Sequence, residues 1–297
     1  SMTTAIGYGS NIVAPALAGI LYPTVGLGGI WPINIATFIV SIAIIVRLTI
    51  PQPSTNAQPA QKTDGRIANL WQEVTFGFRY VWKSSSLRTL LIVTTTFLAA
   101  LQFINTRHDP MILARTDGSS QALGSISTIA GIGGVIGAIA LSVWGGFRQN
   151  ARGMLIGYIG AGFANLVFAL GQSLSVWLPT EFFSSLCFPL IWSSEAAVWM
   201  KATPAKTQGR VFAVGFLVED LVEIPIALLA GVLGDRIFEP AIQSSALIQK
   251  VFGPVVGIGA GAGIALLYLG GAISMILVGF LTLRSSSFDK LRTTMKG

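Results

Sequence analysis

The chain of 297 residues has one cysteine, one histidine and few charged residues, which make up 10% of it. The single cysteine, Cys187, excludes a disulfide framework and any metal site built from cysteines. The single histidine, His108, falls between Arg107 and Asp109 in a predicted loop, where a solvated role is expected and partners for a metal are lacking. One loop histidine cannot serve a buried nucleophile, and no Walker loop for ATP is present. We therefore expect no enzyme, no cofactor and no metal site.

Acidic residues are scarce as well, since 12 Asp and Glu against 19 Lys and Arg give a formal charge of +7. A basic chain can bind nucleic acid, but that requires a basic patch interleaved with exposed aromatic residues, which this sequence lacks. Short cytoplasmic loops of membrane proteins carry an excess of Lys and Arg for reasons of topology alone. The positive charge is therefore interpreted as a topology signal, and no nucleic-acid partner is expected.

Long hydrophobic runs are what the sequence has in abundance. Hydrophobic residues make up 52% of it, and the mean hydropathy is +0.70. A membrane-spanning helix needs about 20 mostly apolar residues. Eight runs meet this length, at 4–22, 25–49, 87–106, 121–145, 152–171, 174–197, 210–233 and 254–283. The sequence thus predicts an all-α polytopic membrane protein in contact with the lipid bilayer, whose long last span is tilted or kinked.

The basic residues fall on alternate loops. Fifteen of the 19 lie in the loops at 50–86, 146–152 and 198–210, at their edges or at the C-terminus, and four lie on the opposite side. Those four are Arg107, Arg115, Arg236 and Lys250, each with an acidic residue in the same loop. The excess of positive charge predicts that the first set of loops and both termini are cytoplasmic, in a bacterial inner (plasma) membrane.

One segment breaks the pattern of short loops and divides the chain. Residues 51–65 are rich in Pro, Gln, Ala and Ser and predict a flexible cytoplasmic linker. Apolar residues then recur at helical spacing over 66–84, which predicts an amphipathic helix on the inner membrane surface or against the helix ends. We expect two transmembrane helices in 1–50, the linker and amphipathic helix in 51–86, a six-helix bundle in 87–284 and a cytoplasmic tail in 285–297.

Glycine-rich faces predict close helix packing. Gly133 and Gly137 are four residues apart, as are Ala130, Gly134 and Ala138, so a neighbouring backbone can approach closely and slide. The glycines at 257, 259, 261 and 263 resemble a dinucleotide-binding loop. That fingerprint requires a soluble βαβ unit, whereas here it begins a predicted span, so packing or a flexible gate is favoured.

Ionisable residues inside predicted spans mark the candidate site. Glu219, Asp220 and Glu223 lie near the middle of the span at 210–233, and Pro225 beside them permits a kink. Three carboxylates this close in a low dielectric are not all expected to be ionised, so at least one should exchange a proton near neutral pH. They are predicted to serve proton coupling, to give a cavity affinity for cations, or to pair with a basic residue elsewhere.

The remaining candidates are two acids and several aromatic residues. Glu181 is a candidate for the substrate pathway, whereas Glu195 is expected to bond loop residues such as Lys201 or Arg210. Trp192 and Phe188 either line an apolar cavity or face lipid. Trp177 and Trp199, near span ends, are expected in an interfacial aromatic belt.

Several segments together resemble major facilitator superfamily exporters of the macrolide and siderophore type. Leu70-Trp71-Gln72-Glu73 with Gly77, Arg79-Tyr80 and Leu87-Arg88 resembles the stretch after that family's central loop. The segments 14–19, 209–211 and 230–236 resemble its fifth helix and the beginning and end of its eleventh. The resemblance implies gating or packing roles for Arg148, Arg152, Gly209 and Arg210. The loop at 145–152 keeps Arg148 and Arg152 but lacks the aspartate of the family's loop signature.

Members of that family have twelve helices, and on this alignment the chain begins at the fifth. The resemblance implies secondary active transport, with proton-coupled efflux of a hydrophobic or amphipathic small molecule such as a drug, a macrolide or a siderophore-like compound. The alternative is a truncated or split membrane protein without transport of its own, which needs a partner chain or self-association to supply the missing helices.

Overall fold

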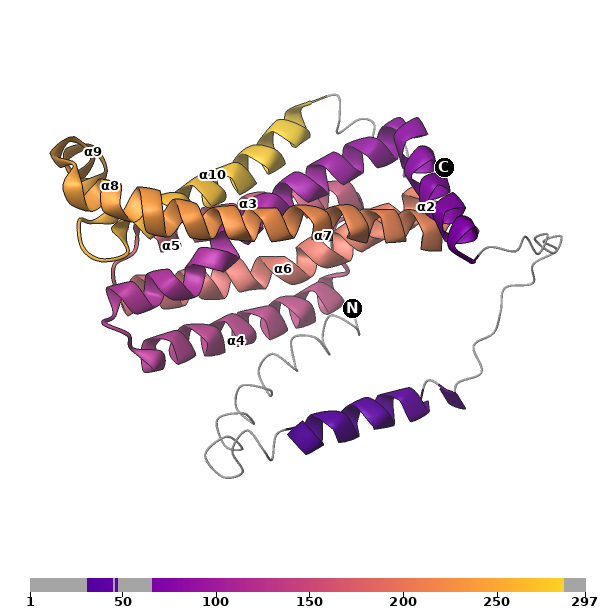
Figure 1. The fold of residues 1–297 in the computed structure, drawn as a ribbon, viewed down its shortest axis with the longest axis horizontal. Coiled ribbons are helices and arrows are strands. Elements are labelled where there is room, and N and C mark those ends of the chain that lie inside the picture. The colour runs from indigo at the N-terminus through magenta and orange to yellow at the C-terminus, as the bar shows by residue number, and fades with distance from the viewer. Residues whose placement is uncertain (1–30, 45, 48–65, 286–297) are drawn as a thin grey trace.

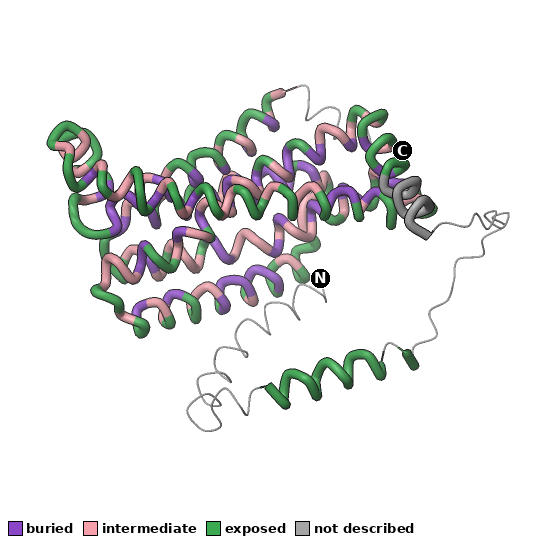
Figure 2. The backbone as a smooth tube through the Cα atoms, viewed as in Figure 1, coloured by how far each residue is buried: buried purple, intermediate pink, exposed green. Residues whose placement is uncertain are grey.

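The structure is a computed structural model, and it describes residues 31–44, 46, 47 and 66–285. All regular secondary structure in these residues is helical, as Figure 1 shows. The predicted span at 4–22, the linker at 51–65 and the tail from 286 lie outside the described residues. Of the span predicted at 25–49, the structure describes residues 46 and 47 and the apolar helix Trp31–Ile44. All its side chains are exposed, and it stands apart from the other helices in Figure 2.

Five of the described helices are long and apolar enough to cross a membrane. They are α3 (Ser85–Arg115), α4 (Ser120–Trp144), α5 (Asn150–Leu170), α6 (Leu174–Ala202) and α10 (Ala262–Arg284). These helices confirm the prediction of an all-helical membrane protein with several membrane-spanning segments. The span predicted at 210–233 forms a helix of 25 residues, α7 (Gln208–Val232), but every 18-residue window of α7 contains three carboxylates and it is not among the five.

The helices pack side by side in the order α4, α6, α5, α10, α3 and α7, and the amphipathic helix α2 (Arg66–Lys83) lies against α7. Buried residues follow the sides of these helices that face one another (Figure 2). Val81 of α2 is buried, and Gly77 lies against the backbone of Arg210. The contacts of α2 thus correspond to packing against helix ends.

Glycine permits the closest of these contacts. A β-carbon at Gly133 or Gly137 of α4 would collide with the carbonyl oxygen of Phe182 or Leu186 on α6. Gly134 and Ala138 are buried on the same helix. Small residues in α4 therefore bring its backbone against that of α6, as is common for packed transmembrane helices.

The last predicted span is wrong in its first part. Helix α7 is followed by the π-helix η1 (Leu233–Phe238), α8 (Glu239–Ser244) and α9 (Ala246–Val256), so the predicted span begins within the end of α9, and the chain then breaks before α10. Gly257 and Gly261 have φ values of +83° and +80°, which residues other than glycine rarely adopt. These glycines end one helix and begin the next, so the spanning helix starts at Ala262.

Glu239 holds this junction together. Its carboxylate accepts hydrogen bonds from the backbone N–H groups of Gly261 (2.7 Å), Gly263 (2.9 Å) and Ile264 (3.3 Å). The first N–H groups of a helix have no partner within the helix and carry a partial positive charge. In the glycine run that resembles a dinucleotide-binding loop, the carboxylate of Glu239 therefore occupies the place where a phosphate would bind.

Glu239→Gln is expected to lower the free energy of unfolding by about 1–2 kcal/mol, because a charged acceptor at a helix N-terminus is replaced by a neutral one. Thermal unfolding in detergent would measure the loss, and hydrogen exchange should rise at residues 257–264. Asp117→Asn removes one negative charge from an exposed position and is the matched control. Equal stability of the two variants would contradict the capping role.

Candidate functional site

A cavity of about 240 Å³ opens between α6 and α7. Its wall is mainly apolar and aromatic, with two carboxylates. The lining residues are Trp192, Glu195, Ala196, Trp199 and Met200 from α6, and Phe212, Gly215, Phe216 and Glu219 from α7. Phe188 stacks on Trp192 one turn further along α6, with ring centroids 6.3 Å apart. Trp192 therefore lines the cavity, and the half-buried ring of Phe188 packs against it.

Glu195 is buried beside this cavity, and the prediction that it bonds Lys201 is wrong. Its Oε2 accepts a hydrogen bond from the hydroxyl of Tyr158 on α5, at 3.3 Å. Lys201 donates instead to the Oδ1 atom of Asn150, at 2.7 Å. The Arg210 guanidinium lies 5.3 Å from the ring centroid of Phe76 on α2. Glu195 faces inward because it lies on the side of α6 that packs against α5, away from the loop.

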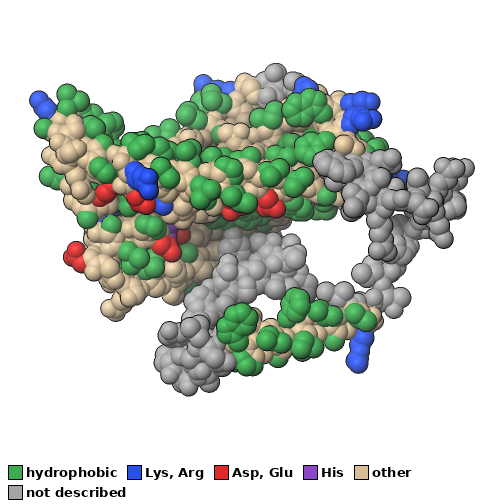
Figure 3. Space-filling view, viewed as in Figure 1, with side chains coloured by type: hydrophobic (Ala, Val, Ile, Leu, Met, Phe, Trp, Pro, Cys, Tyr) green, Lys and Arg blue, Asp and Glu red, His purple; other side chains and the backbone are tan. Residues whose placement is uncertain are grey.

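The three α7 carboxylates do not share one environment. Glu219 is half-buried and lines the cavity, whereas Asp220 and Glu223 are exposed. In Figure 3 the acidic side chains gather on the face along which α7 runs. Pro225 is also exposed, and α7 continues through it to Val232. The sequence grouped the acids correctly on one helix, but it did not show that Glu219 lines the cavity beside α6 while the other two carboxylates are exposed.

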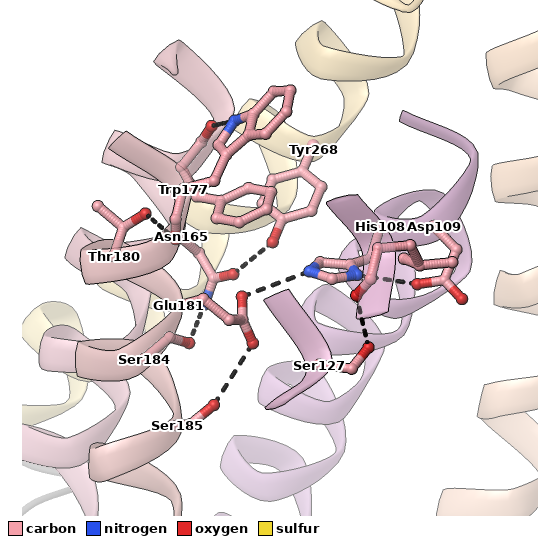
Figure 4. Close-up of polar contacts among 12 residues, drawn as sticks. His108, Asp109, Ser127, Asn165, Trp177, Thr180, Glu181, Ser184, Ser185 and Tyr268 are labelled. Atoms are coloured by element: carbon pink, nitrogen blue, oxygen red, sulfur yellow. Dashed lines mark hydrogen bonds and ion pairs between the residues drawn. The ribbon is translucent and has the colours of Figure 1, made fainter. Parts of the chain in front are cut away.

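A second polar cluster joins α3 and α6, and it corrects the prediction for His108. Helix α3 continues to Arg115, so His108 lies within this apolar helix and not in a solvated loop. Its Nε2 atom lies 3.3 Å from Oε2 of Glu181 on α6, and its Nδ1 atom lies 2.9 Å from Oδ1 of Asp109. Figure 4 shows the imidazole between the two carboxylates.

A second set of hydrogen bonds lies beside Glu181 and joins α5, α6 and α10. Ser185 donates to Oε1 of Glu181 at 3.4 Å. Nearby, the hydroxyl of Tyr268 donates to Oδ1 of Asn165 at 2.7 Å, and the Asn165 amide donates to Ser184 at 2.8 Å. These groups are buried, and Figure 4 shows them beside Glu181. Four helices of the bundle thus meet at one polar region inside an apolar core.

The predicted aromatic belt is also corrected. Trp177 and Trp199 are buried, with 1% and 8% of their surface exposed. The Trp177 indole N–H donates to the backbone carbonyls of Phe168 and Gly171, and Trp199 lines the cavity. The sequence correctly predicted that both residues lie near the ends of α6. It could not predict which side of α6 they occupy, because that depends on the neighbouring helices.

The residues with predicted gating roles lie at the helix ends. Arg148 is exposed in the turn between α4 and α5, and Arg152 is exposed in the first turn of α5. Gly209 is exposed near the start of α7, where a β-carbon would meet no neighbour. These three residues are therefore separate from both polar regions within the bundle.

Sequence reasoning missed His108, Tyr158, Asn165 and Tyr268. The predicted span ended at 106, directly before the charged residues Arg107 and Asp109. The structure accommodates Arg107 in the helix by pairing it with Asp235 at 2.8 Å, where Gly234 leaves room for the guanidinium. A helix predicted over 85–115 would have placed His108 inside a span. The charged residues beside it favoured a loop instead.

Comparison with protein-family models, with curated proteins and with solved structures finds no match. The fold and the site by themselves define the class of the protein. It is an α-helical, membrane-embedded protein whose bundle contains an aromatic cavity with two carboxylates and a buried histidine–carboxylate cluster.

Proposed function

We propose that the chain is a secondary active transporter of the major facilitator type that exports a hydrophobic or amphipathic small molecule in exchange for protons. The cavity between α6 and α7 carries this proposal, because it combines four aromatic side chains with Glu195 and Glu219. In this function the chain lies in the bacterial inner membrane with both termini in the cytoplasm, as its charge distribution favours.

The cavity chemistry favours a lipophilic cation as the substrate. Aromatic rings bind apolar bodies and attract cations at their faces. A carboxylate in a medium of low dielectric binds a cation much more strongly than it does in water. Trp192, Phe212 and Phe216 would contact the apolar part, and Glu219 would approach the positive charge. A proton on Glu219 would remove that attraction, so substrate and proton would compete for one side chain.

Asp220→Asn or Glu223→Gln is expected to abolish proton-coupled efflux and to leave membrane insertion intact. Both carboxylates are exposed on α7, which packs against the spanning helix α3, and at membrane depth a charged group without a function is costly. Efflux of a fluorescent cation measured against external pH would test this, with Asp117→Asn as the control. Efflux that is unchanged at every pH would rule out coupling through these two groups.

The second candidate function is that of one component of a larger assembly, without transport of its own. The exposed face of α7 favours it, since Leu221, Ile224 and Leu228 each expose at least 60% of their surface beside Asp220 and Glu223. Lipid would cover the apolar side chains but not the carboxylates. Polypeptide beyond the described helices, from a partner chain or a second copy, would then complete a water-filled pathway.

One experiment separates the two functions. An efflux-deficient bacterium would express the chain alone, or the chain extended by the codons that precede it in its gene, and accumulation of a lipophilic cationic dye would be measured. Low accumulation with the chain alone, reversed by a protonophore, supports the transporter. Rescue only by the extended chain supports the second function. High accumulation with both forms, despite membrane insertion, would overturn the proposal of export.

A further inference from the structure

We propose that His108, Asp109 and Glu181 form a proton-binding site that links α3 to α6 when it is loaded and releases α6 when it is empty. The proposal deepens the transport function above and rests on it for its role in coupling. The site is separate from the cavity, because Glu181 and Glu195 are fourteen positions apart on α6, about 21 Å along the helix axis.

The geometry of the imidazole fixes how many protons the cluster holds. Both ring nitrogens of His108 face carboxylate oxygens, at 2.9 Å and 3.3 Å. A neutral imidazole carries one N–H, so it satisfies only one of these two contacts, and an ionised carboxylate is an acceptor only. The observed arrangement therefore holds two protons among the three groups, either as an imidazolium between two carboxylates or with one carboxyl protonated.

Loss of one proton from this arrangement breaks one of the contacts. A lone pair on nitrogen would then face a carboxylate oxygen, and the net charge of the cluster would change from −1 to −2. The contact to Asp109 lies within one helix, whereas the contact to Glu181 is the one that joins two helices. If the remaining N–H of His108 keeps its hydrogen bond to Asp109, deprotonation breaks the contact between His108 and Glu181. The link between α3 and α6 is then lost.

The surroundings restrict which groups take part. Among the residues that the structure describes, the charged groups that contact His108 are Asp109 on its own helix and Glu181 on α6. From α5 it meets the ring of Phe168, with centroids 5.1 Å apart, and from α10 the ring of Tyr268, at 6.3 Å. Arg107 is paired with Asp235 and is therefore not the partner of Glu181.

The three groups of the cluster differ in their exposure. The side chain of Asp109 is 64% exposed, whereas those of His108 and Glu181 are 19% and 13% exposed. In the empty state the Nδ1–H of His108 donates to Asp109, so the proton that loads the cluster binds between Nε2 and the Glu181 carboxylate, and the Asp109 carboxylate balances the charge of the resulting imidazolium. The net change is one proton gained by the cluster when it loads and one proton lost when it empties.

Helix α6 connects this site to the cavity. Glu181 lies near its beginning and Glu195 in its second half, and Pro189 between them cannot donate a backbone hydrogen bond to Ser185. A helix bends most readily at such a position. Release of the first half of α6 from α3 therefore changes the angle at which Trp192, Glu195 and Trp199 meet α7.

The first test does not depend on transport. His108 is the only histidine, so protein labelled with ¹⁵N-histidine and purified through a histidine-free tag gives the ring signals of one imidazole. We expect Glu181→Gln to move the midpoint of the imidazole titration in lipid by about one pH unit or more, since a charged partner is removed. Asp117→Asn should leave it unchanged. A midpoint unaffected by Glu181→Gln would overturn the proton site.

The second test measures coupling in proteoliposomes. Glu181→Gln and His108→Gln are expected to lose uphill accumulation of a cationic dye driven by a pH gradient, by about tenfold or more. Exchange of labelled for unlabelled dye at equal pH should be retained, because it needs no net proton movement. Normal gradient-driven accumulation by both variants would overturn the coupling role. A wild-type protein that moves no dye would defeat the transport function, while the imidazole titration would still decide the proton site.

Discussion

Glu219→Gln is expected to reduce export of a lipophilic cation by about tenfold or more, because a charged contact in a medium of low dielectric is replaced by a neutral one. Glu219 is the α7 carboxylate that lines the aromatic cavity, and the amide keeps its size. Export of a neutral compound of similar shape should change little, since its contacts are with the aromatic wall. Initial rates of both compounds in the same vesicles would measure the difference.

Two further variants show whether charge or shape is responsible. Phe216→Leu removes an aromatic wall of the same cavity and should weaken transport of neutral and cationic compounds alike. Glu195→Gln leaves Tyr158 with a hydrogen-bond acceptor and tests the second carboxylate. Equal loss of both substrates in the Glu219 variant would mean that the residue supports the structure of α7 and does not select cations.

Gly137→Ala is expected to destabilise the bundle by about 1–3 kcal/mol, the usual cost of forcing an extra methyl group into a packed contact. The new β-carbon would meet the backbone carbonyl of Leu186, which cannot turn aside as a side chain can. Gly133→Ala meets the carbonyl of Phe182 in the same way. Unfolding in a denaturing detergent would measure the loss.

The matched control lies in the same helix. A β-carbon at Gly124 of α4 would meet no other atom within 4 Å, so Gly124→Ala should stabilise α4 by about 0.5–1 kcal/mol through backbone entropy alone. Opposite signs for the two substitutions would show that the close approach of α4 and α6, and not the composition of the helix, sets the requirement for glycine. The same sign for both would contradict this packing argument.

Local patterns predicted much of the fold. Apolar length alone located the helices α4, α5 and α6 to within a few residues, because crossing a bilayer requires a minimum run of apolar residues. Helical spacing predicted α2 in the same way. The end of α3 and the beginning of α10 were wrong, since Arg107 finds a partner in Asp235 and Glu239 supplies the acceptor for the first N–H groups of α10.

Hydropathy and spacing were enough to establish that the protein belongs in a membrane, which of its segments are helical, and that acidic residues lie within those segments. The pairing of polar groups, in contrast, depended on how the helices pack. His108 and Glu181 are 73 positions apart, and Asn165 and Tyr268 are 103 apart, so no local pattern relates them. Hydropathy is a property of each segment alone, whereas the partner of a buried polar group depends on which helices pack side by side and on the faces they present.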